Sequence, residues 1–137
     1  RSPKSKQGES EQFFKDIGIP SSHLKLVTDA MIDTVNSSWG TAFRSRIKEN
    51  MGSMGGKTGT VQVRRISKME REKGVKKNED LPWKERDHAL FVGFAPAKAP
   101  IYAVSVIVEH GGSGATKAAP IARDILVKAQ SKKLTLD

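Results

Sequence analysis

Residues 56–63 read Gly-Lys-Thr-Gly-Thr-Val-Gln-Val, and the glycine-rich stretch 51–56 leads into them. From Thr60 onward, β-branched residues alternate with polar or charged ones at a period of two, which predicts a β-strand. A strand that begins with glycines and carries the cation of Lys57 beside the hydroxyls of Thr58 and Thr60 is suited to binding a carboxylate. We therefore take residues 57–60 as the candidate functional motif.

A Gly-Lys-Thr sequence also occurs in phosphate-binding P-loops, and the spacing separates the two possibilities. A P-loop needs a glycine five residues before its Gly-Lys pair, but that position is Met51, and Gly52 comes one residue too late. A P-loop is also followed by a helix, because its amides wrap the phosphates, whereas residues 60–64 have the pattern of a strand. The P-loop interpretation therefore fails on both counts.

Length and composition limit the remaining possibilities. The chain has 137 residues, of which 36% are hydrophobic, so it can bury one modest core. Its formal charge of +9 suits an anionic environment such as nucleic acid, an anionic membrane face or an acidic wall polymer, and the charge alone does not choose among them.

Cysteine and histidine usage bears on metals and disulfides. The chain has no cysteine, which excludes disulfides and thiolate metal sites, and its three histidines show no ligand spacing. We therefore expect no metal and no cofactor. No apolar run reaches about 18 residues and no signal-like segment is present, so we expect this stretch neither to span a membrane nor to direct its own export.

Periodicity predicts an α+β fold: a three-stranded antiparallel meander with packed helices. Five connecting residues between the second and third strands favour their pairing as a hairpin, and the last helix should lie across the three strands with the first helix burying one face. The expected elements are a helix over 22–36, strands over 56–66, 88–95 and 101–109, and a helix over 116–132.

Two further segments complete the layout. Residues 1–20 form a polar N-terminal segment, of which we expect residues 1–11 to have little order, and 21–137 form one lobe. The lobe contains a charged insertion over 67–87, whose first part, 67–73, can form a short helix before Gly74. Because basic and acidic residues are mixed there, we expect a solvated and mobile insertion.

Four blocks of this sequence, in order, resemble the C-terminal part of the transpeptidase domain of penicillin-binding protein 2, a class B, elongation-specific peptidoglycan D,D-transpeptidase. The stretch from Asp29 to Ala42 is similar to the segment that precedes the Lys-Thr-Gly strand in that family, and the resemblance covers about 23–130. The four blocks are 56–62 (GKTGTVQ), 88–96 (HALFVGFAP), 107–114 (IVEHGGSG) and 119–124 (APIARD).

The resemblance implies a C-terminal lobe with a partial penicillin-binding transpeptidase or β-lactamase-like fold. By this resemblance, Lys57 would raise the positive potential beside the nucleophile and would help to bind the carboxylate of the donor peptide. The hydroxyls of Thr58 and Thr60 would bind the same carboxylate. The backbone amide of Thr60 would form half of an oxyanion hole, and Gly59 would let the substrate lie close to the strand. The implied reaction is acyl transfer: a serine attacks the D-Ala-D-Ala bond of a stem peptide, and an acceptor amine then resolves the acyl-enzyme into a crosslink.

The chain departs from the family pattern in the other two motifs. No Ser-x-Asn sequence occurs, and the two Ser-x-x-Lys strings, which begin at Ser22 and Ser45, lie in stretches that match other parts of the family. We therefore expect no nucleophile in this chain, which would carry one wall of an active site and be inactive alone.

Several residues have structural interpretations that we prefer to functional ones. His88 and His110 are interpreted as packing or hydrogen-bonding residues at strand ends, and Trp39 and Trp83 as small hydrophobic anchors. The loop glycines Gly111, Gly112 and Gly114 are expected to permit positive φ angles rather than to line the substrate groove.

An alternative function is a basic interaction module that binds an anionic polymer or a cell-wall elongation partner. Nucleic acid is not expected, because aromatic residues make up only 6% of the chain and fall mostly in the predicted core. By resemblance, the parent protein would bind stem peptides and β-lactams on the periplasmic side of a bacterial inner membrane, anchored by a segment outside this chain. Upstream strands complete the sheet in the family, so we expect an open edge after Ile101 through which the piece could dimerise.

Overall fold

The computed structural model describes residues 17–48 and 52–133, with side chains described as far as Ser131. The N-terminal segment predicted over 1–20 therefore lies largely outside the described residues. In chain order the elements are α1 (Ser21–Asn36), the 3₁₀ turn η1 (Phe43–Ser45), β1 (Gly55–Val61), α2 (Lys68–Lys73), the 3₁₀ turns η2 (Asn78–Asp80) and η3 (Trp83–Glu85), β2 (His88–Ala95), β3 (Tyr102–Val108), the π-helical turn η4 (Gly114–Ala118) and α3 (Ala119–Lys133).

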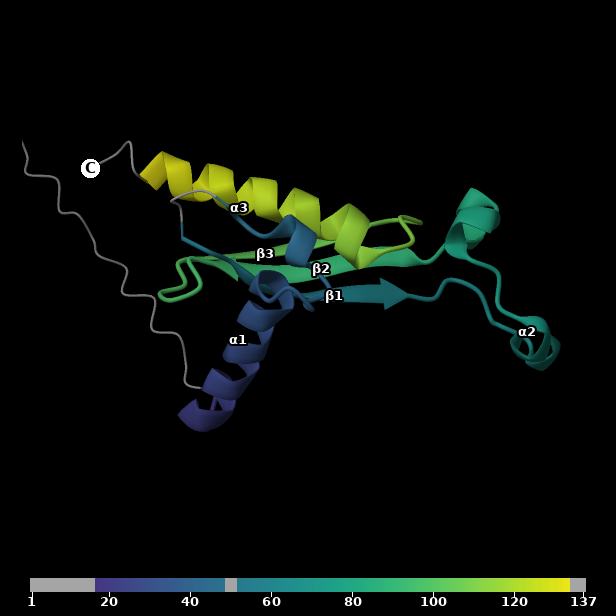
Figure 1. Cartoon of the computed structure of the whole chain (residues 1–137), viewed down its shortest axis with the longest axis horizontal. Helices are drawn as coiled ribbons and strands as arrows, with labels where there is room; N and C mark the ends of the chain where they lie inside the picture. The colour runs from purple at the N-terminus through teal and green to yellow at the C-terminus, as the bar shows by residue number, and fades with distance from the viewer. Residues whose placement is uncertain (1–16, 49–51, 134–137) are drawn as a thin grey trace, which may run out of the picture.

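The three strands form an antiparallel meander in the order β1-β2-β3, which confirms the predicted α+β fold (Figure 1). Strand β1 ends at Val61 rather than at residue 66 as the alternating sequence predicted. The reason is its partner: β2 begins at His88, directly opposite Val61, so no strand of the described residues lies beside 62–66. Alternation continues in the sequence, but the ladder of hydrogen bonds does not.

The core lies on one face of the sheet. Phe91 on β2 and Leu126 on α3 are almost fully buried and belong to the same cluster, which small alanines of η4 and α3 help to close. Helix α3 packs on β2 and β3, and it is η4 that reaches β1 (Figure 1). The predicted helix over 116–132 thus crosses the sheet in two parts, a π-helical turn followed by a regular helix from Ala119.

Helix α1 buries only its C-terminal end, contrary to the expectation that one whole face would be covered. Val35 is fully buried in the core, whereas Leu26 and Val27 are mostly exposed. In Figure 1 the N-terminal half of α1 projects away from the sheet. Leu24, nearer the start of the helix, is exposed as well, to 39%. No helix in the described ranges is long and apolar enough to cross a bilayer.

The insertion between β1 and β2 contains the predicted short helix. The side chain of Ser67 accepts a hydrogen bond from the backbone N–H of Glu70 and so caps α2, and Gly74, with φ of +103°, follows its end. The segment is solvent-exposed except for a few positions, of which Leu81 is buried.

The prediction that Trp39, which follows α1, is a hydrophobic anchor is wrong, because 76% of that side chain is exposed.

Candidate active-site strand

Lys57 and the two residues after it lie on β1, an outer strand of the described sheet. The side chain of Lys57 is exposed, and its ammonium Nζ donates a hydrogen bond of 2.7 Å to the carbonyl oxygen of Thr58. No carboxylate pairs with Lys57 within the described part of the chain. Its positive charge therefore remains available to an anionic ligand at the strand edge.

The contact between Lys57 and the carbonyl of Thr58 indicates which way the edge peptides face. A carbonyl that meets an exposed ammonium lies on the open side of β1, away from β2. Backbone groups of a strand repeat their direction every second residue, so the amide of Thr60 would face the same open edge. The side chain of Thr60 is exposed as well.

A threonine outside β1, which the sequence did not identify as a site residue, contacts the side chain of Thr58 on this strand. The hydroxyls of Thr41 and Thr58 lie 3.2 Å apart, in hydrogen-bonding range. Thr41 follows α1, whose last residue, Asn36, donates from Nδ2 to the carbonyl oxygens of Met54 (2.9 Å) and Ile32 (2.7 Å). The resemblance of the segment from Asp29 to Ala42 to the family was the signal that could have pointed to both side chains.

Glycines around the motif make room for close packing. A Cβ at Gly56 would lie 2.2 Å from the ring of Phe91, and one at Gly93 would lie 2.7 Å from the same ring. Gly56 and Gly93 are direct partners in the β1–β2 register, so the Phe91 ring covers the space above both. A Cβ at Gly59 would have, among the described residues, only the Cβ of Leu90 within 4 Å, at 3.3 Å. Gly59 therefore leaves the strand more open at this point than Gly56 does.

Neither serine of the two Ser-x-x-Lys strings is an accessible group beside the Lys-Thr-Gly motif. Ser45 is 1% exposed, so its hydroxyl is closed to a substrate. Ser22 is in the first turn of α1, the end that projects from the sheet in Figure 1, and the lysine of its string, Lys25, pairs with Asp29 at 2.7 Å. The expectation that the chain holds no nucleophile stays a prediction.

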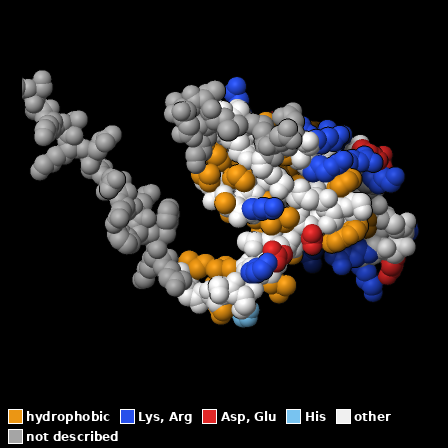
Figure 2. Space-filling view, turned by 60° about the vertical axis from the view of Figure 1, so that its left-hand side comes forward, with side chains coloured by type: hydrophobic (Ala, Val, Ile, Leu, Met, Phe, Trp, Pro, Cys, Tyr) orange, Lys and Arg blue, Asp and Glu red, His pale blue; other side chains and the backbone are white. Residues whose placement is uncertain are grey.

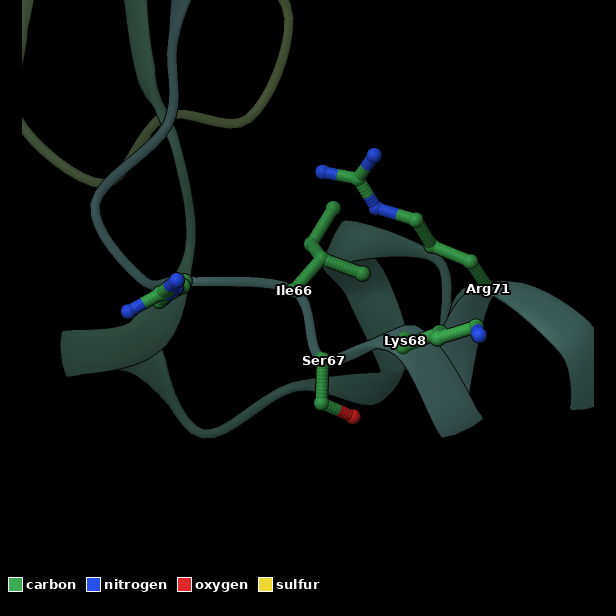
Figure 3. A pocket seen from close by; sticks show the side chains of 5 residues that line it. Ile66, Ser67, Lys68 and Arg71 are labelled. Carbon is green, nitrogen blue, oxygen red and sulfur yellow. The ribbon is translucent and has the colours of Figure 1, made fainter.

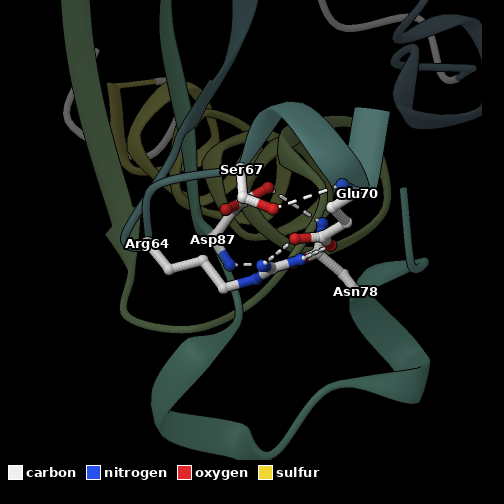
Figure 4. A network of polar contacts seen from close by, with 5 residues as sticks. All are labelled: Arg64, Ser67, Glu70, Asn78 and Asp87. Atoms are coloured by element: carbon white, nitrogen blue, oxygen red, sulfur yellow. Dashed lines mark hydrogen bonds and ion pairs between the residues drawn. The ribbon is translucent and has the colours of Figure 1, made fainter. Parts of the chain in front are cut away.

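A polar network organises the insertion next to β1 (Figure 4). The guanidinium of Arg64 forms two hydrogen bonds to the carboxylate of Glu70, one of 2.8 Å from Nη1 to Oε2. The hydrogen bonds from Arg64 hold the pKa of Glu70 below its ordinary range, and the same bonds raise the pKa of Arg64. Both side chains are about one-fifth exposed. This bidentate pair links the segment that follows β1 to α2.

We expect Arg64→Gln to raise the pKa of Glu70 toward the ordinary glutamate range, because the substitution removes both the charge and the paired donors. In the unmodified protein, the lowered pKa means that the pair stabilises the fold above the unfolded-state pKa of Glu70. That contribution is lost as the pH falls through the folded-state pKa. An NMR titration of the Glu70 carboxyl carbon measures this change, with Arg65→Gln as the matched control. Equal titration curves in the two variants would contradict the assignment.

A second surface of the insertion is basic. A pocket of about 550 Å³ is lined by Arg65, Lys68 and Arg71 together with Ile66 and Ser67. Figure 3 shows the side chains of Ile66 and Arg71 extending toward the same side, while Ser67 points the other way. On the face drawn in Figure 2, Lys and Arg side chains gather mainly at the right-hand side, and fewer Asp and Glu side chains are visible. Among the described residues, no group of His, Asp or Glu side chains is arranged to hold a metal ion.

An antiparallel meander with a helix across one face and an exposed Lys-Thr-Gly strand at its edge is characteristic of the penicillin-interacting acyl-transfer enzymes. Residues 9–127 match the family described as the penicillin binding protein transpeptidase domain. The chain belongs to this family, as a C-terminal part of a transpeptidase domain of the penicillin-binding protein 2 type.

Relatives and solved structures agree on that placement. The peptidoglycan D,D-transpeptidase MrdA of Acinetobacter baumannii is 42% identical over 97 residues, which are 68% of this chain and 13% of that protein. MrdA of Salmonella typhimurium is 36% identical over 101 residues, covering 74% of this chain and 15% of the relative. The chain thus spans about one-seventh of the length of these relatives.

Among solved structures, penicillin-binding protein 2 of Helicobacter pylori in its complex with MreC has a TM-score of 0.63 at 26% identity. That match covers 80% of this chain and 18% of the other. Penicillin-binding protein 2 of Pseudomonas aeruginosa in complex with WCK 5153 has a TM-score of 0.55 at 34% identity, covering 76% of this chain and 18% of the other. Sequence and fold therefore both give penicillin-binding transpeptidases as relatives.

Proposed function

We propose that this chain is the part of a serine-type peptidoglycan D,D-transpeptidase that supplies the Lys-Thr-Gly wall of the active site. The observation that carries the proposal is the exposed ammonium of Lys57, which forms no ion pair with a carboxylate of the described residues and lies on an outer strand of a transpeptidase fold. The site residues are Lys57, Thr58, Gly59 and Thr60. A serine supplied by another part of the full-length protein acts as the nucleophile, so the chain alone does not form an acyl-enzyme.

Each group on the strand has a role in this proposal. Lys57 and the hydroxyls of Thr58 and Thr60 bind the carboxylate of a stem peptide or a β-lactam, because a cation flanked by two donors matches a carboxylate. The amide of Thr60 points out of the open edge and stabilises the oxyanion of the tetrahedral intermediate. The Thr41 hydroxyl, 3.2 Å from that of Thr58, supports this proposal by fixing how the Thr58 hydroxyl is directed.

The whole protein, in this proposal, works at the periplasmic face of a bacterial inner membrane. The names of the relatives support the location, since peptidoglycan is their stated substrate. The H. pylori structure, solved with MreC, supports an elongation protein as a partner of the full-length enzyme. Strand β3, whose only described neighbour is β2, provides the edge where further strands of the domain can add, or where the isolated chain can dimerise.

Labelling with a fluorescent penicillin tests the proposed function. We expect covalent labelling of the full-length protein, none of the chain alone, and labelling again when the chain is mixed with the rest of the transpeptidase domain. Covalent labelling of the chain alone would overturn the proposal, since Ser22 or Ser45 would then be a nucleophile. An unlabelled full-length protein would overturn the assignment as a transpeptidase.

The basic pocket favours a second candidate function, docking of an anionic polymer. Its three cations, on Arg65, Lys68 and Arg71, form none of the ion pairs found in the described residues. We expect the full-length protein to sediment with poly-glutamate at low salt and to release it as the salt concentration rises. Replacing the three cations with glutamine should abolish this binding, and replacing the exposed Lys25, Lys76 and Lys77 provides the control with an equal loss of charge.

A further inference from the structure

His110, two residues after the end of β3, has a backbone conformation that needs an explanation. Its φ of +54° makes it the only non-glycine residue with a positive φ in the described ranges, and such a conformation persists only where the surroundings enforce it. The backbone N–H of His110 donates to Nδ1 of His88 at 2.9 Å, and its own ring Nδ1 lies 2.9 Å from the carbonyl oxygen of Arg86. Hydrogen bonds to both the backbone and the side chain of His110 therefore hold it in this conformation.

These two contacts determine the tautomers of the histidines. Nδ1 of His88 accepts a hydrogen bond, so that nitrogen carries no proton. Nδ1 of His110 faces a carbonyl oxygen, so it carries the proton and donates it. The rings lie 4.7 Å apart between centroids, and Trp83 packs edge-on against His110 at 4.4 Å. The expectation that both histidines are hydrogen-bonding residues at strand ends is confirmed.

The loop residues that follow His110 are hydrogen-bonded to the same segment, next to Arg86 and His88. The N–H of Gly112, whose φ is +80°, donates to the carbonyl oxygen of Asp87 at 2.9 Å. Asn78 holds Asp87 in turn: its Oδ1 accepts from the Asp87 N–H at 2.8 Å, and its Nδ2 donates to Oδ2 at 3.0 Å (Figure 4). The loop over 110–112 is thus bound to three consecutive residues, 86–88, where the insertion joins β2.

The other end of this loop rests on the candidate active-site strand. A Cβ at Gly114 would lie 2.3 Å from the carbonyl oxygen of Leu90, 2.6 Å from that of Gly59 and 3.0 Å from the nitrogen of Gly59. Gly114 therefore lies against the peptide groups on both sides of Gly59, one of which carries the amide of Thr60. A shift of the loop would move that peptide group, because backbone meets backbone with no side chain between.

We propose that His88 and His110 are positioning residues for acyl transfer. They latch the loop 110–114 against Gly59 and so hold the amide of Thr60 in the direction required of an oxyanion donor. This inference rests on the proposed function, and neither histidine contacts the substrate. The sequence assigns no such role, because the members of the latch come from three separate segments, 78–88, 110–114 and 59–60.

The test uses the full-length protein with His88→Leu, which removes the acceptor for the His110 N–H. We expect faster hydrogen exchange over 57–60 and 110–114, together with an acylation rate constant for a penicillin lowered about tenfold at unchanged initial binding. His88→Asn, whose amide oxygen can reach the place of Nδ1, should restore most of both properties. His23→Leu, at an exposed histidine on α1, is the matched control and should change neither.

A second variant keeps the test decisive if His88→Leu does not fold. His110→Gly relieves the positive φ and keeps the backbone N–H, but it removes the hydrogen bond to Arg86, so exchange should rise over the same two segments. Unchanged exchange over 57–60 in either folded variant would overturn the latch, as would a loss of thermal stability with no change in acylation. If the unmodified protein is not acylated, the proposed function fails, and the exchange measurements still decide whether the latch exists.

Discussion

Replacing Lys57 with alanine in the full-length protein is expected to lower the rate constant for acylation by a penicillin about 10²–10³-fold. The reason is electrostatic: the ammonium is the cation of the exposed strand edge, and no carboxylate within the described residues neutralises it. The fold should be little affected, because within the described residues the Lys57 ammonium donates only to the neighbouring carbonyl of Thr58. Stopped-flow or gel-based labelling with a fluorescent penicillin measures the rate.

Two variants show whether the effect belongs to the site. Lys57→Arg keeps the charge and should retain more activity than the alanine variant, although a guanidinium differs from an ammonium in its geometry. Lys68→Ala removes an equal charge from the basic pocket of the insertion and should leave acylation unchanged. An equal loss in Lys57→Ala and Lys68→Ala would mean that overall charge, rather than the strand edge, promotes acylation.

The second large effect concerns the core beneath the strand. Phe91→Ala is expected to lower the free energy of unfolding by about 3–5 kcal/mol. Phe91 is fully buried, and its ring covers Gly56 and Gly93, which have no side chains with which to fill the space. The surrounding backbone cannot collapse into the cavity without distorting the β1–β2 ladder, so the cost should lie in the upper part of the range for core truncations.

Val92→Ala is the matched control for Phe91→Ala. Val92 follows directly on the same strand but lies on the other face, and 46% of its side chain is exposed, so its truncation should cost about 1 kcal/mol or less. Denaturant unfolding of the full-length protein, monitored by tryptophan fluorescence, compares the two. Similar losses in both variants would contradict the assignment of Phe91 to the centre of the core. Val92 is the partner of Lys57 in the β1–β2 register, so Val92→Ala also changes a direct neighbour of the motif. A lower acylation rate in Phe91→Ala but not in Val92→Ala would therefore show that the buried core supports the Lys-Thr-Gly motif.

Local signals in the sequence were sufficient to predict the main strands and helices. The three strands and their meander, the helix that ends at Asn36, and the short helix before Gly74 follow from periodicity and turn residues, which depend on near neighbours, although the end of β1 does not. The glycines were predicted only in part. Gly112 does adopt a positive φ, but Gly114 is required for close approach to β1 and β2.

What the sequence by itself determined is therefore the α+β class, the order of the strands, and the Lys-Thr-Gly motif on a strand. Only the tertiary structure decided that β1 stops at Val61, that α1 leaves Leu26 exposed, and that His88 and His110 meet at one end of the sheet. The physical reason is common to all three. Strand pairing ends where the partner strand ends, burial depends on what another segment covers, and a hydrogen bond between residues 22 positions apart depends on the register of β2 and β3.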